Sequence, residues 1–182
     1  IFNYVKLRFV RPRGLILHSV STLSHTSSRP AARSRESVSP PRPGTRLGAA
    51  AALAPGRGEL QVAHIARQSR VTSHRSTSPL KLWVPRRPGA AAWIYATTFG
   101  GGLVSGDSVH VDMELGPNTT TVFTTQSSTK VFRTLEDHEC SQQLHARVEN
   151  GALLAVAPDP LVCYRGAVYR QHNKIHLEPQ AN

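Results

Sequence analysis

The sequence predicts a mainly β protein. From residue 58 onward, apolar residues recur with a period of two rather than 3.6. Gly, Pro and Asn residues interrupt the chain about every ten residues, which leaves short strands between turns. The best helical stretch, Thr134 to Arg147, lacks a continuous apolar stripe. Short strands at this spacing fit a sandwich, a barrel or a stacked β-solenoid.

The expected strands begin early in this region. Leu60 and Val62 fit a first strand and residues 79–84 a second. In residues 109–115 apolar and polar side chains alternate, as in a strand with one buried face. A Gly-Pro-Asn turn follows at 116–118, and residues 119–125 then form a β-branched run of high strand propensity.

The C-terminal third continues this pattern. Alternation returns in residues 144–148, and Asn150-Gly151 predicts a hairpin into an apolar strand at 152–157. Residues 168–171 and 174–178 suggest two more short strands. A sheet that stopped there would leave its edge uncovered, so we expect the β domain to be incomplete at its C-terminus.

Charge divides the 182 residues into two regions. The formal net charge is +11, with 22 Lys and Arg against 11 Asp and Glu. Residues 1–56 hold nine of these basic residues, one acid and six of the 13 prolines, whereas residues 57–182 carry a net charge of only +3. Such Arg/Ser/Pro-rich sequence buries too little apolar surface to offset the entropy of ordering. We therefore expect a disordered basic arm at 1–56, followed by a β domain at 57–182.

Three explanations for the arm remain open. Its composition is that of an organelle-targeting segment. It is also that of an electrostatic nucleic-acid tether. Because the chain begins at Ile1, the arm is alternatively an artefact of gene prediction. Nucleic-acid binding is disfavoured, because no aromatic residue is interleaved with the charge between Arg11 and Arg57.

Several protein classes are excluded. No apolar run approaches the roughly 18 residues of a membrane-spanning helix. Two cysteines are too few for a disulfide-stapled scaffold or a four-thiolate zinc site. A hydrolase built on Ser105 or Cys163 lacks a recognisable base. These exclusions leave a soluble protein, which we expect in the cytoplasm unless the arm directs it to an organelle.

The densest glycine cluster lies at residues 100–107. A phosphate-binding loop is excluded because no Gly-Lys-Ser/Thr ending follows, and a hydrolase elbow because Ser105 has glycine on only one side. Two interpretations remain: a tight β-corner capped by Asp107, or a carboxylate held rigidly for function. Gly101, Gly102 and Gly106 would supply the turn in either case.

Two polar segments follow. Residues 124–130 are all polar and would form either the lining of a wet channel or a solvated edge. Further on, His138, Cys140 and His145 offer imidazole and thiolate donors suited to nickel, zinc or copper. Their spacing does not match a closed structural site, so they predict a weak metal site or an exposed polar loop.

The two motifs together resemble the urease accessory protein D family, called H in some bacteria. The pattern Gly-Gly-x-x-x-Gly-Asp at 101–107 is followed in register by Thr-Gln-x-x-x-Lys-Val-aromatic at 125–132. The resemblance covers roughly residues 58–178, about the first half of a family member. Its other matching segments are Gly58-Glu59-Leu60, Pro79-Leu80-Lys81-Leu82, Pro158-Asp159-Pro160, Tyr164-Arg165-Gly166-Ala167 and Gln171.

The resemblance implies a β-helix-like stack of sheets and a non-enzymatic nickel metallochaperone scaffold. Members of the family bind apo-urease and the accessory proteins F and G. Nickel would be in transit rather than tightly bound, and GTP would act only through the G partner. The candidates for the nickel path or a partner interface are Asp107, Gln126, Thr129, Lys130 and Asp159.

Overall fold

The computed structural model describes residues 53–86, 89–135 and 138–182, and the backbone of residues 15–23. These residues are mainly β, as the sequence predicts. A single turn of 3-10 helix, η1 (Phe99–Gly101), precedes β6. The strands are β1 (Leu15–Leu23), β2 (Arg57–Ile65), β3 (Gln68–Ser76), β4 (Leu80–Trp83), β5 (Ala92–Thr98), β6 (Gly102–Leu103), β7 (Ser108–Leu115), β8 (Thr120–Thr125), β9 (Thr129–Val131), β10 (Cys140–Val148), β11 (Leu153–Val156), β12 (Leu161–Cys163) and β13 (Tyr169–Leu177).

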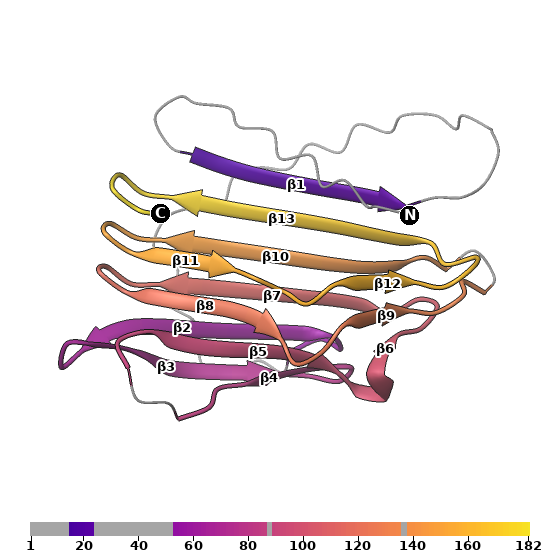
Figure 1. Ribbon diagram of the computed structural model, residues 1–182, viewed down its shortest axis with the longest axis horizontal. Helices are drawn as coiled ribbons and strands as arrows, with labels where there is room; N and C mark the ends of the chain where they lie inside the picture. The colour runs from indigo at the N-terminus through magenta and orange to yellow at the C-terminus, as the bar shows by residue number, and fades with distance from the viewer. Residues whose placement is uncertain (1–14, 24–52, 87–88, 136–137) are drawn as a thin grey trace.

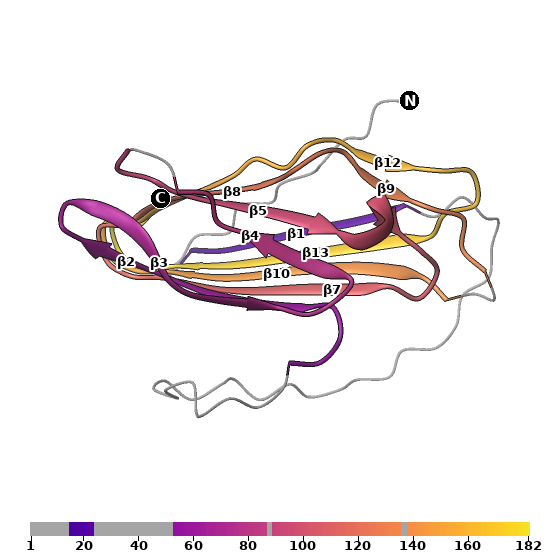
Figure 2. The same cartoon turned by 90° about the horizontal axis from the view of Figure 1, so that it is seen from below.

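The strands form three sheets that successive coils of the chain visit in turn. The six-stranded sheet has the order β1-β13-β10-β7-β2-β3, the four-stranded sheet β11-β8-β5-β4, and the three-stranded sheet β12-β9-β6. Strands β7, β8 and β9 make one coil, and β10, β11 and β12 lie parallel to them in the next. Figure 1 shows this stacking, and Figure 2 shows the six-stranded sheet on one side with β5, β8, β9 and β12 on the other. Of the architectures that the sequence allowed, the β-solenoid is the one formed.

The core lies between the layers and is built from stacked rows of apolar side chains. Because neighbouring coils pair in parallel register, equivalent residues of successive strands lie side by side. One such row joins Val62, Leu115, Val148 and Leu177. All four side chains are buried, with exposed fractions of 8% or less. Burial of these rows holds the coils together.

The corner between η1 and β6 depends on glycine for a steric reason. A Cβ atom on Gly102 would lie 2.5 Å from the Lys130 carbonyl oxygen and 2.8 Å from the Phe132 ring. Gly101 and Gly106 instead have φ angles of +73° and +85°, which favour glycine. Gly101 and Gly102 thus lie at the corner before or at the start of β6, whereas Gly106 lies in the turn after β6.

Most strands predicted from alternation are present. Residues 109–115 lie in β7, residues 119–125 in β8, and residues 144–148 in β10. The early predictions correspond to β2 and β4. The sequence does not predict β3 or β5. Strand β3 has a single apolar residue, Val71, and β5 has apolar residues on both faces, so neither alternates clearly between apolar and polar residues.

Two local predictions were wrong. Asn150-Gly151 forms a turn but no hairpin, because β10 and β11 belong to different sheets and β11 pairs in parallel with β8. The two short strands expected in residues 168–178 are one continuous strand, β13. Much of the stretch 134–147, where the missing apolar stripe already disfavours a helix, lies in β10.

The expected arm at 1–56 lies mostly outside the described residues. Its described part includes β1, which pairs antiparallel with β13 at the edge of the six-stranded sheet. This pairing differs from the disorder predicted for that stretch. Within the described residues, we find no helix with the length and apolar character of a membrane-spanning segment.

Candidate functional site

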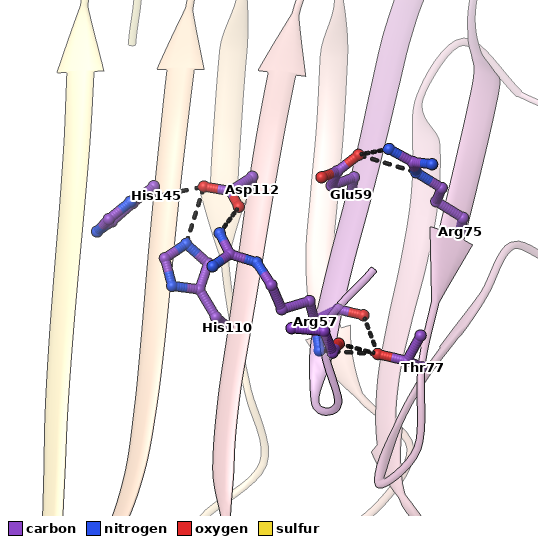
Figure 3. Close-up of polar contacts among 8 residues, drawn as sticks. Arg57, Glu59, Arg75, Thr77, His110, Asp112 and His145 are labelled. Carbon is purple, nitrogen blue, oxygen red and sulfur yellow. Dashed lines mark hydrogen bonds and ion pairs between the residues drawn. The ribbon is translucent and has the colours of Figure 1, made fainter. Parts of the chain in front are cut away.

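A cluster of ionisable side chains lies on the outer face of the six-stranded sheet, over β7 and β10 (Figure 3). His110 and Asp112 are two residues apart on β7, so their side chains leave the same face of the strand. The register places His145 of β10 directly beside Asp112. We call these three residues the His-Asp-His cluster.

Asp112 Oδ1 is the centre of the cluster. It lies 2.9 Å from His110 Nε2 and 3.5 Å from His145 Nδ1. One ligand atom from each of the three residues falls within 4.8 Å of the other two. The His110 side chain is 14% exposed, whereas those of Asp112 and His145 are each 37% exposed. The cluster is therefore partly desolvated and still open to solvent.

Arg57 holds the second oxygen of the same carboxylate. Its Nη2 atom lies 2.9 Å from Asp112 Oδ2, which leaves Oδ1 facing the two histidines. The Arg57 backbone is itself fixed, because its N–H donates to Thr77 Oγ1 and its carbonyl accepts from the Thr77 N–H. Burial alone would raise the pKa of the Asp112 carboxyl, but hydrogen bonds from His110 and Arg57 outweigh it and lower that pKa below its usual value.

The His145 imidazole favours its neutral form. Burial lowers its pKa most, the positive charge of a protonated His110 lowers it further, and the nearby Asp112 only partly opposes these effects. The His110 and His145 rings meet edge to face, with centroids 4.5 Å apart. His172 of β13 continues the row, with its ring centroid 6.2 Å from that of His145.

The neighbouring side chains on β2 and β3 neutralise each other. Glu59 is the register partner of Asp112 on β2, and its Oε2 atom lies 2.7 Å from Arg75 Nη2 (Figure 3). Its charge is therefore directed away from the cluster toward Arg75. Among the described residues, the possible metal ligands that converge here come from β7 and β10.

The donor set determines what this site can do chemically. Two imidazoles and a carboxylate suit divalent transition metals such as nickel, zinc or copper. None of the three side chains is a hydroxyl or thiol nucleophile of the kind used in covalent catalysis. The cluster is therefore a candidate site for a metal ion or a proton.

The three metal ligands predicted from sequence do not converge, and only His145 belongs to the cluster. Cys140 is fully buried and its Sγ atom lies 3.0 Å from the Val104 carbonyl oxygen. Burial raises the pKa of the Cys140 thiol, and the Asp107 charge raises it further. His138 lies at the corner before β10, where its carbonyl accepts from the Gly106 N–H at 3.0 Å. Among the described residues, the His-Asp-His cluster is the one group with metal-site geometry.

Asp107 caps the turn at residues 104–107, which follows β6. Its Oδ2 atom accepts a hydrogen bond from the Val104 N–H at 2.8 Å, and its own N–H donates to the Val104 carbonyl. Ser105 is similarly engaged, since its Oγ atom bonds the backbone of Leu135 and His138. The capping interpretation of Asp107 is therefore confirmed, and its role in a nickel path stays a prediction.

The remaining path candidates lie at a different corner, between the four-stranded and three-stranded sheets. Gln126 is exposed just after β8, and Thr129 and Lys130 lie on β9. Asp159 follows β11 in the next coil, where its Oδ2 atom accepts from Thr125 Oγ1 at 3.3 Å. These residues are stacked in neighbouring coils but are separate from the corner that holds Asp107. Their role in transport also stays a prediction.

Sequence reasoning missed His110, Asp112 and Arg57 as site residues. His110 and Asp112 were read only as the polar half of an alternating strand, although His-x-Asp in a strand places both side chains on one face. That spacing was the available signal. The approach of His145 depends on pairing between strands more than 30 residues apart, which the sequence pattern does not reveal.

Comparisons with known proteins agree on one family. A family model described as "UreD urease accessory protein" matches residues 54–182. Urease accessory protein D of Oryza sativa subsp. indica is 41% identical over 139 residues, which is 74% of this chain and 45% of the rice protein. UreD of Sorangium cellulosum is 38% identical over 127 residues, or 70% of this chain and 40% of the relative. Urease accessory protein D of Arabidopsis thaliana is 41% identical over 130 residues, or 69% and 44%.

The chain spans about half the length of the curated relatives it matches. The matched region begins just before β2 and includes every strand of the His-Asp-His cluster.

Proposed function

Because the chain belongs to the UreD urease accessory protein family, we propose that it assists urease maturation as a non-enzymatic nickel metallochaperone scaffold. In this role it binds apo-urease and helps nickel reach the apoprotein in the cytoplasm. The family match over residues 54–182 is the observation that carries the proposal. The names of the rice and bacterial relatives, which describe accessory proteins of urease, support it.

The architecture is compatible with a scaffold. Its corners are held by backbone and side-chain hydrogen bonds, such as those of Ser105 and Asp107, and its sheets present broad outer faces. Aromatic side chains lie on one of these faces: Trp83 is 49% exposed and packs against Tyr95, with ring centroids 5.4 Å apart. Exposed aromatic residues are common at protein interfaces.

We further propose that accessory proteins F and G are partners of the complete assembly. Nickel would be its cargo, and GTP would enter only through the G partner. Gln126 and Lys130 are exposed and therefore accessible to such partners. Asp107, Thr129 and Asp159 complete the proposed set for the nickel path or a partner interface.

The proposal is tested with a chimera. Residues 54–182 replace the matching segment of the rice relative, and the chimera is expressed with urease in cells that lack their own D protein. We expect urease activity to be restored and the chimera to co-purify with apo-urease and protein F. The unaltered rice protein is the positive control. A folded chimera that binds neither partner and leaves urease inactive would contradict the proposal.

A further inference from the structure

Two distances within the His-Asp-His cluster are close to those between the ligands of one metal ion. Ligand atoms about 2.1 Å from one ion lie about 3.0–3.4 Å apart at octahedral to tetrahedral angles. The Asp112 Oδ1 atom is 2.9 Å from His110 Nε2 and 3.5 Å from His145 Nδ1, which brackets this range. One ligand atom of each residue lies within 4.8 Å of the other two, so side-chain adjustments of up to about 1.5 Å would bring all three atoms to one ion.

The surroundings hold the ligands in position. The Arg57 guanidinium bonds only Asp112 Oδ2, so the carboxylate is oriented with Oδ1 toward the histidines. Such an outer partner is typical of metal-ligating carboxylates. His110 and Asp112 are carried by β7 in the middle of the six-stranded sheet, where β2 and β10 pair with it on both sides. Pairing on both sides holds β7, and with it these two ligands, in place.

We propose that His110, Asp112 and His145 bind a divalent transition-metal ion on the outer face of the six-stranded sheet. Imidazole nitrogen with one carboxylate oxygen favours Ni²⁺, Cu²⁺ or Zn²⁺ over Mg²⁺, which prefers all-oxygen sites. The partial exposure of Asp112 and His145 allows an ion to enter from solvent and leave again. The metal site itself is argued from geometry alone. A role of this site in carrying nickel to urease rests in addition on the proposed function.

Calorimetric titration of the full 182-residue chain with Ni²⁺ tests the site. We expect one ion per chain for the wild type and no comparable binding of Mg²⁺. His110→Ala, His145→Ala and Asp112→Asn should each weaken Ni²⁺ binding at least about tenfold. Asp112→Asn keeps the side-chain shape and its capacity to accept from Arg57, so it separates lost ligation from lost folding.

His176→Ala is the matched control, because His176 is an exposed histidine of β13 outside the cluster. It should bind Ni²⁺ like the wild type. Cluster variants that bind Ni²⁺ with unchanged affinity and stoichiometry, or a folded wild-type chain that binds none, would overturn the site. This outcome is distinct from failure of the chimera, which would overturn the urease role and leave a measured metal site in place.

Discussion

At the scale of single residues, Gly100 and Gly102 require glycine for two different reasons. Gly100 has a φ of +79° and nothing within 4 Å of an added Cβ atom, so its requirement is conformational. Gly102 has an extended φ of 171°, so its requirement is space beside the Lys130 carbonyl. The sequence shows both as members of one glycine cluster, and only the structure distinguishes their roles.

This distinction predicts different costs for two alanine substitutions. Gly100→Ala should lower the free energy of unfolding by about 1 kcal/mol, the usual cost of a left-handed non-glycine residue. Gly102→Ala should lower it by about 3 kcal/mol, because the backbone of β9 must move to admit the methyl group. Denaturant titration of the two variants measures both values. Equal unfolding midpoints for the two variants would show that the close approach of Gly102 to Lys130 does not add to the cost of the substitution.

At the scale of elements, strand alternation predicts which side chains face the core but not which strands have neighbours on both sides. Leu115 of β7 is 1% exposed because β2 and β10 flank it. Leu153 belongs to an apolar strand, β11, yet it is 41% exposed. Leu153 pairs with Thr120 of β8, and the buried residue of that strand is the next one, Thr121, so the Leu153 side chain lies on the outer face of the sheet.

The two leucines should therefore respond differently to truncation. Leu115→Ala should lower the free energy of unfolding by about 2–5 kcal/mol, as for fully buried leucines that leave a cavity. Leu153→Ala, a matched control of the same chemistry, should change it by less than about 1 kcal/mol. Urea unfolding followed by far-ultraviolet circular dichroism distinguishes the two. A large loss for Leu153→Ala would mean that its side chain packs more fully than the static structure indicates.

At the scale of the whole molecule, coiling of the chain is what creates the candidate site. His110 and His145 belong to successive coils, and parallel pairing of β7 with β10 brings them together. An unfolded chain holds the same side chains far apart on average, so metal binding and folding should be coupled.

Coupling predicts that Ni²⁺ stabilises the folded chain. At a free concentration about 100 times its dissociation constant, Ni²⁺ should add about 2.7 kcal/mol to the free energy of unfolding. Thermal unfolding with and without Ni²⁺ measures the effect as a higher Tm. The increase should be retained in His176→Ala and largely lost in His145→Ala. An equal increase in both variants would point to binding elsewhere on the chain.

The sequence by itself determined the class, several strands and the family resemblance. The alternation of apolar and polar residues over 109–115 correctly predicts which side chains are buried in β7. It does so because a β-strand places successive side chains on opposite faces. The glycine and Thr-Gln motifs are local patterns too, and they indicated the family that the comparisons found.

Only the tertiary structure decided the partners of each strand and the members of the candidate site. A strand's side-chain pattern does not say whether its neighbour is the preceding strand or one a full coil away. The Asn150-Gly151 turn therefore joins two sheets instead of forming a hairpin, and His145 lies beside Asp112 rather than Cys140. The physical reason is that parallel pairing between coils joins residues distant in sequence, and burial of the shared core selects that pairing.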